Sequence, residues 1–131
     1  MRGGRARSIG VAMRLFLSVE GPPPVRADPG RSADRSSPNA EPLALAAEAL
    51  MVKAPMSFAL REPFGITGVF GSTKPPRGGH GAIDPIIEVL VDVGVLEDER
   101  LEDWERELQD PDVGELYTVT VEPTGTPVSS L

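Results

Sequence analysis

The chain has no cysteine among its 131 residues, so neither a disulfide framework nor a thiolate metal site or nucleophile is available. It also lacks any apolar run near the roughly 20 residues that a membrane-spanning helix needs. The fairly apolar residues 9–19 are interrupted by Arg14, are followed by Glu20 and have no small-residue cleavage site, which argues against a secretory signal. We therefore expect no membrane partner and a cytoplasmic location.

Apolar residues make up 40% of the chain, enough for a modest core, whereas 14 glycines and 14 prolines require that much of it be turn or loop. We expect one domain over residues 13–123, a disordered N-terminal extension at 1–12 and a disordered tail at 124–131. The extension has no hydrophobic period, and Met13 is a second candidate for the biological start besides Met1. The intact mass of the natively expressed protein would decide between the two.

The net charge of −7 is unevenly distributed along the chain. Arginines gather before residue 36, whereas the region from Asp84 to Glu122 is densely acidic and holds only two cations, Arg100 and Arg106. Such an asymmetry is compatible with a nucleic-acid-binding arm beside an acidic body. It is also compatible with a flexible, solvated, arginine-rich N-terminal region, so the charge pattern alone leaves both interpretations open.

The hydrophobic pattern predicts several regular elements. Alternating apolar residues predict a strand over residues 14–20, and the glycine and three prolines that follow end it. A long loop at 22–40 has little to bury. Strong helix formers predict a helix over 41–53 with Asn39 as its N-cap, and β-prone residues predict strands over 66–70 and 115–122.

The best-defined element is a helix that begins at Asp84. Its side chain is expected to accept a hydrogen bond from the free N–H groups of the first turn, and Pro85 has a φ already suited to the first helical position. The helix is apolar on nearly every side, with Glu88 and Asp92 as exceptions, which indicates burial against a sheet. Gly94 is expected to end the helix in the left-handed conformation and to lead into an acidic turn.

The segment EVLVDVGVLEDE at residues 88–99 is similar to the region of RusA-like Holliday-junction resolvases where a buried helix ends in an alanine-glycine-valine turn and reaches a pair of aspartates. The opening strand followed by GPPP resembles that family's N-terminal strand and turn, and the element order agrees over about residues 13–123. The resemblance implies an α/β (α+β) fold with a mixed sheet of about four strands packed by two helices, usually as a homodimer.

Residues 100–108 have two interpretations. Leu101, Trp104 and Leu108 follow a helical period, which favours a short amphipathic helix. The family resemblance instead implies a strand after the acidic turn, and we lean to the strand or an irregular edge.

The same resemblance implies an endodeoxyribonuclease that cuts branched DNA such as a Holliday junction, in DNA recombination and repair, with Mg²⁺ held by carboxylates. The implied acidic pair is Asp98 and Glu99. An alignment with a four-residue deletion adds Asp84 as a third catalytic and metal-binding carboxylate, and it places Pro85 and Glu88 where the family has asparagine and lysine.

An ungapped alignment anchored on Gly94 gives a different result. It places the family's Asp-x-Asp-Asn on residues 78–81, where both aspartates and the asparagine are missing, and its lysine on Asp84. His80 then becomes a candidate ligand for a softer metal. These departures suggest an impaired endonuclease, and the alternative is a non-catalytic RusA-fold binding or assembly module.

Binding to duplex DNA draws its affinity from basic side chains that neutralise phosphates, and an acidic body disfavours it. Any DNA contact would fall to a small set of basic residues outside the acidic region or at its margin. These candidates are Lys74, Arg77, Arg100, Arg26 and Arg31.

Overall fold

The computed structural model describes residues 14–28, 30–53, 60–71 and 82–124. Its helices are α2 (Glu41–Lys53) and α3 (Ile83–Val93), and its strands are β1 (Leu15–Glu20), β2 (Phe64–Phe70), β3 (Glu102–Gln109) and β4 (Leu116–Pro123). Short 3-10 turns cover Glu99–Leu101 and Pro111–Val113. The predicted α+β class, with a mixed four-stranded sheet and two helices, is confirmed.

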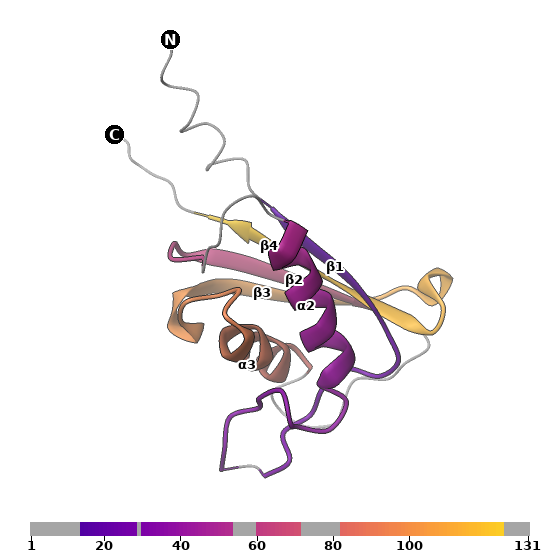
Figure 1. Cartoon of the computed structure of the whole chain (residues 1–131). Coiled ribbons are helices and arrows are strands. Elements are labelled where there is room, and N and C mark those ends of the chain that lie inside the picture. Colours follow the sequence, from indigo (N-terminus) through magenta and orange to yellow (C-terminus); the bar gives the residue numbers. More distant parts are fainter. Residues whose placement is uncertain (1–13, 29, 54–59, 72–81, 125–131) are drawn as a thin grey trace.

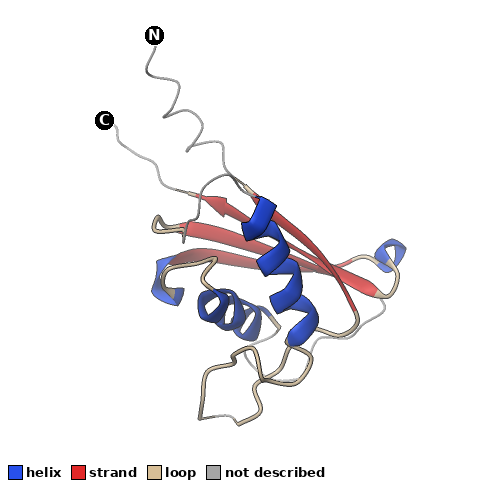
Figure 2. Ribbon diagram, viewed as in Figure 1, coloured by secondary structure: helices blue, strands red, loops and turns tan. Residues whose placement is uncertain are grey.

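The four strands form one sheet in the order β1-β4-β2-β3. β4 runs antiparallel to both of its neighbours, whereas β2 and β3 are parallel and are connected through α3. Both helices lie on the same face of the sheet (Figures 1 and 2). The result is a two-layer arrangement in which β1 and β3 are the edge strands.

The core lies between the helices and the sheet and follows the alternation of the strands. On β4 the buried residues are Tyr117, Val119 and Val121, and the Phe70 ring stacks on Tyr117 at 5.6 Å between centroids. Alternate residues of a strand point to opposite faces, so burial of alternate apolar residues on β1, β2 and β4 shows that one face of the sheet carries the core. No residue of β3 is buried.

Helix α3 begins two residues earlier than predicted: its first residue is Ile83 rather than Pro85, and the residue at its N-cap is Ala82 rather than Asp84. The expectation that Asp84 caps the helix is therefore wrong: no side chain caps it, and Asp84 lies within the first turn. The predicted end is confirmed, because Gly94 adopts φ +106° and its N–H donates to the carbonyls of Leu90 and Val91. Since the N-cap position is taken by Ala82, the Asp84 carboxylate is free for other contacts.

The predicted N-cap of α2 is also wrong. Asn39 has φ +65° and its side-chain N–H group donates to the carbonyl of Pro23 at 3.3 Å. The helix itself starts at Glu41, directly after the buried Ala40. The Asn39 side chain thus links two parts of the loop and does not accept a hydrogen bond from the N–H groups at the start of α2. Short amide side chains commonly bond to nearby backbone in this way instead of capping a helix.

The loop between β1 and α2 is more firmly held than its composition suggests. Its Ala33 is buried, the Arg26 guanidinium pairs with Glu88 of α3, and the Arg35 guanidinium pairs with Glu48 of α2. The Arg35 N–H also donates to Asp92 at 3.1 Å. The loop is therefore attached to both helices through charged and backbone hydrogen bonds.

For residues 100–108 the strand interpretation is confirmed and the helical one is wrong. A 3-10 turn ends at Leu101, and β3 then pairs with β2 from Glu102 to Gln109, with one residue bulged out of the register. The Trp104 ring lies over Gly65 of β2, because a Cβ built at Gly65 would overlap the indole. The hydrogen bonds to β2 and the contact between the Trp104 ring and Gly65 favour a strand more strongly than the spacing of the apolar residues favours a helix.

No helix within the described ranges is long and apolar enough to cross a membrane.

Candidate metal site

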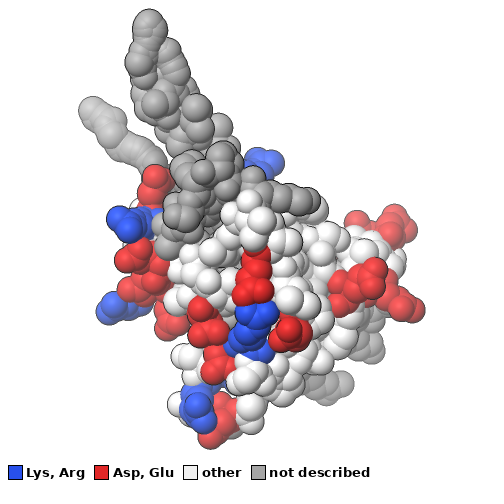
Figure 3. Space-filling model, in the orientation of Figure 1, with Lys and Arg blue, Asp and Glu red and all other residues white. Residues whose placement is uncertain are grey.

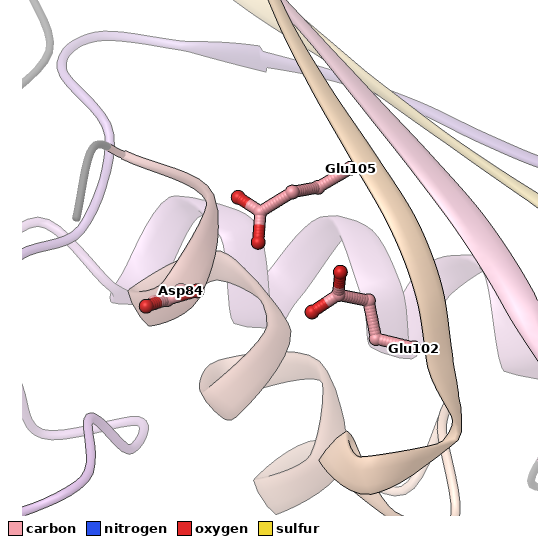
Figure 4. A group of neighbouring side chains, drawn as sticks. All are labelled: Asp84, Glu102 and Glu105. Atoms are coloured by element: carbon pink, nitrogen blue, oxygen red, sulfur yellow. The ribbon is translucent and has the colours of Figure 1, made fainter.

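Three carboxylates converge where α3 begins and β3 starts. Asp84 comes from the first turn of α3, and Glu102 and Glu105 come from the N-terminal half of β3. One carboxylate oxygen from each residue lies within 4.8 Å of those of the other two. In Figure 4 the two glutamates extend from the strand toward the helix that carries Asp84. We call these three residues the acidic triad.

A β-bulge places both glutamates on the same face of β3. Glu102 pairs with Phe64, but the next residue of β2, Gly65, pairs with Trp104, so Asp103 is an extra residue without a register partner. In a regular strand, residues three apart would point to opposite faces. Because of this extra residue, Glu102 points to the helix-facing side of the sheet. Glu105 points to the same side, because it pairs with the buried Ile66.

The start of α3 is attached to the same strand. The Ala82 N–H, one of the free donors at the helix N-terminus, donates to the Glu107 carboxylate at 3.3 Å. Ile83 beside it is fully buried in the core. Asp84 is therefore held next to β3 by its two preceding residues, while its own side chain is partly exposed.

The triad concentrates negative charge. Loss of hydration raises the pKa of Glu105 most, the charges of Glu102 and Asp84 raise it further, and the result is a pKa of about 7. A proton therefore relieves part of the repulsion near neutral pH, and a bound cation would relieve it in the same way. Glu105 is also exposed, so the cluster is open to an ion from solvent.

A pocket of about 200 Å³ lies beside the triad, lined by Asp84 and Glu102 and also by Glu99 and Arg26. The Arg26 Nε donates to one Glu88 oxygen at 3.0 Å, its terminal nitrogen donates to the other, and the Ala33 N–H donates to the first oxygen at 2.7 Å. These bonds fix the guanidinium in the pocket wall. The pocket thus has a carboxylate side and a guanidinium side.

The donor set of the triad fits a hard divalent cation. All three ligands are carboxylate oxygens, which Mg²⁺ prefers over nitrogen or sulfur, and they come from two separate elements. A few protein carboxylates leave positions for water and for a phosphate oxygen in an octahedral shell. Magnesium is therefore compatible with the triad, which differs from the predicted ligand set in two of its three members.

Of the two predicted acidic residues after α3, only one lies at the pocket. Glu99 lines the pocket beside Asp84, as expected for residues of one site. Asp98 does not line it: its carboxylate accepts hydrogen bonds from the backbone and guanidinium of Arg100, at 2.9 Å for the terminal nitrogen. These bonds lower the pKa of Asp98, and they pair its carboxylate with the Arg100 guanidinium.

Among the predicted DNA contacts, Arg26 is held by Glu88 and Arg100 by Asp98. Arg31 lines a shallow hollow in the loop with Asp28 and Asp34. The remaining DNA-contact candidates, Lys74 and Arg77, and the candidate metal ligand His80 lie outside the described residues. On the side that carries the helices, acidic side chains are more widespread than basic ones (Figure 3).

Sequence reasoning did not identify Glu102 and Glu105. A strand with regular alternation would place them on opposite faces, so they did not qualify as a pair. One available signal was the run of acids in EDERLEDWERE, which continues well past the acidic turn into a region that resemblance predicted to be a strand.

The comparisons with known proteins add no family assignment. No model of a protein family matches the chain, and no curated protein matches it. The fold and the acidic triad are therefore the observations on which a function can be argued.

Proposed function

We propose that the chain is a RusA-like endodeoxyribonuclease that cleaves phosphodiester bonds of branched DNA with the help of Mg²⁺. The observation that carries the proposal is the convergence of Asp84, Glu102 and Glu105 at the junction of α3 and β3. The sequence resemblance pointed to the acidic turn after α3, at Asp98 and Glu99, and only the alignment with a deletion included Asp84. The triad shares Asp84 with that prediction. The order of strands and helices is also the order that the resemblance implies.

In this proposal Asp84, Glu102 and Glu105 would hold the metal. When bound, Mg²⁺ would supply an activated water and would neutralise charge on the phosphate oxygens. In the metal-free site the pKa of Glu105 is about 7, so a proton would compete with the metal for this carboxylate near neutral pH. Glu99 lines the adjacent pocket and extends the negative wall.

Arg26 is the basic residue among the described pocket-lining side chains. Its bidentate pair with Glu88 orients the guanidinium, and the negative charges of Asp84 and Glu99 also act on it. A phosphate that enters between the triad and Arg26 would meet the metal on one side and guanidinium N–H donors on the other. In this proposal the metal and Arg26 would therefore hold the phosphate together, although the protein is acidic overall.

The decisive experiment is cleavage of a labelled synthetic four-way junction with Mg²⁺ or Mn²⁺. We expect metal-dependent cleavage, reduced at least about 100-fold in Asp84→Asn and in Glu105→Gln, because each removes a ligand charge. Glu62→Gln is the matched control, since Glu62 is an exposed carboxylate outside the triad. Circular dichroism should show that all three variants are folded.

Calorimetry separates this proposal from a non-catalytic binding or assembly module. The nuclease predicts Mg²⁺ or Mn²⁺ binding that is weakened in Glu102→Gln. Absence of both cleavage and metal binding at high protein concentration would refute the nuclease and support the alternative. Cleavage that persists unchanged in Asp84→Asn would refute the assignment of the triad.

A further inference from the structure

The pocket beside the acidic triad holds one guanidinium among four carboxylates. Its charged lining residues are Asp84, Glu88, Glu99 and Glu102, together with Arg26. The negative charges of Asp84 and Glu99 reach the Arg26 guanidinium. With the carboxylates in excess, an anion would be repelled from this pocket until a divalent cation neutralised part of the charge. Any anion that binds here therefore depends on a cation at the triad.

Arg26 uses only part of its guanidinium for Glu88. A guanidinium has five N–H donors, and Glu88 accepts one from Nε at 3.0 Å and one from Nη2. The others, both on Nη1 and one on Nη2, have no acceptor among the residues that the structure describes. One donor from each terminal nitrogen makes a second fork, which matches two oxygens of one phosphate. Arg26 is thus oriented by one fork and has another to offer to a ligand.

The number of free oxygens distinguishes two kinds of phosphate. An internal phosphodiester has two non-bridging oxygens, so a contact with the cation leaves one for Arg26. A terminal phosphate has three acceptor oxygens, which allows one to face the cation while two meet the fork. It also carries up to about two negative charges, whereas a diester carries one. Both differences favour a terminal phosphate between the triad and Arg26.

Most other arginines in the described ranges are already engaged within the chain. Of the seven there, five form ion pairs with carboxylates; these are Arg14, Arg26, Arg35, Arg61 and Arg100. The Arg106 guanidinium lies over the Trp104 ring at 5.2 Å from its centroid. A polyanion draws its affinity from many basic side chains, whereas a ligand with one phosphate group needs only the pocket. The described residues therefore suit a small phosphate ester.

The size of the pocket agrees with such a ligand. Its volume is about 200 Å³, and pockets that enclose a whole drug-sized molecule hold roughly 300–1,000 Å³. The pocket would therefore take the phosphate group and leave the rest of the ester outside. Ile87, which is 2% exposed, is the apolar residue of the lining, so recognition in this pocket falls to charged groups.

We propose that this pocket binds the terminal phosphate of a small phosphomonoester, such as a mononucleotide, together with the divalent cation, an assignment that rests on the proposed function for its metal. Arg26 is then the residue that selects a terminal phosphate over a diester. The phosphate balances the charge of the cation, and the cation reduces repulsion from the carboxylates. Each ligand should therefore raise the affinity of the other by the same factor.

Calorimetric titration of the full chain with adenosine 5′-monophosphate (AMP) tests the site. We expect AMP to bind at least about tenfold more tightly with saturating Mg²⁺ than without it. With Mg²⁺ present, AMP should also bind at least about tenfold more tightly than 3′,5′-cyclic AMP, whose phosphate is a diester. This preference is measured on the wild-type protein, so it does not depend on how a variant folds.

Arg26→Lys tests the second fork. Lysine keeps a positive charge near Glu88 but has no fork, so the preference for AMP over cyclic AMP should fall below about threefold while the affinity for Mg²⁺ stays unchanged. Arg61→Lys is the matched control, because Arg61 pairs with Glu97, is 81% exposed and does not line the pocket. Its preference for AMP should equal that of the wild type.

Three results would overturn the proposal. The first is equal affinity for AMP and cyclic AMP in the wild type, and the second is an unchanged preference in Arg26→Lys. If Mg²⁺ still binds in either case, the proposed nuclease site stands while its phosphate ligand is wrong; absence of Mg²⁺ binding would remove both. The third is a 5′-phosphorylated oligonucleotide that binds at least about tenfold more tightly than AMP, which would assign the phosphate to the end of a DNA strand.

Discussion

The pair between Arg26 and Glu88 makes a quantitative prediction about stability. Glu88 is only 8% exposed, and the Arg26 side chain is 31% exposed. Replacing Arg26 with Met removes the cation but keeps an aliphatic chain, and leaves a nearly buried carboxylate with the Ala33 N–H as its remaining donor. Breaking a fully buried pair costs roughly 3–5 kcal/mol, and the partial exposure of Arg26 reduces the expected loss to about 2 kcal/mol.

Urea denaturation at pH 7 measures this loss as a change in the free energy of unfolding. Arg61→Met is the control, because Arg61 pairs with Glu97 at 3.1 Å while its side chain is 81% exposed. Its loss should cost no more than about 0.5 kcal/mol. Adding Glu88→Gln to Arg26→Met should recover more than half of the stability, since the neutral amide can still accept from Ala33.

The same pair predicts how the loss depends on pH. Burial alone would raise the pKa of Glu88, but the hydrogen bonds from Arg26 and Ala33 outweigh it, and the pKa lies below its ordinary 4.5. The stability contributed by the pair is therefore present above about pH 4.5 and is lost as the pH falls through the folded-state pKa. The difference between wild type and Arg26→Met should shrink on acidification. A loss below about 0.5 kcal/mol at pH 7, or a difference that grows at low pH, would refute this reasoning.

Three further substitutions test other parts of the fold by thermal or urea denaturation. Tyr117→Phe should stabilise the protein by about 1 kcal/mol, because the buried hydroxyl has no hydrogen-bond partner among the described residues; a loss of stability would reveal a partner. Gly94→Ala should cost about 1–2 kcal/mol, because Gly94 has φ +106°; a neutral effect would contradict that conformation. Gly65→Ala should cost about 1–3 kcal/mol and shift Trp104 emission, because the added methyl overlaps the ring; an unchanged spectrum would place the indole elsewhere.

Local chemistry determined most of the fold. The β-prone residues at 115–122 predicted β4, and Gly94 predicted the end of α3, because both features depend on neighbours in sequence. Residues 100–108 could not be decided in the same way. The spacing of their apolar residues fits a helix, whereas their hydrogen bonds go to β2, a strand more than thirty residues earlier.

The candidate site was only partly predictable for the same reason. Asp84 was identified as a site residue through one alignment with the resolvase family, although the capping role expected from its position at the helix start was wrong. Glu88 reads as a polar interruption of an apolar helix, and only the structure shows that a distant loop supplies Arg26 and the Ala33 N–H to its carboxylate. Contacts between segments this far apart leave no periodic signal in the sequence.

The extra residue at Asp103 affects how relatives of this chain can be found. With the bulge, acids separated by two residues reach the helix-facing side of β3. A homologous strand without the extra residue would bring acids separated by one residue to the same side. A search for a fixed spacing of acidic residues would miss either the homologues with the bulge or the homologues without it. A search for one acid in the first turn of a buried helix and two on one face of the following strand would find both.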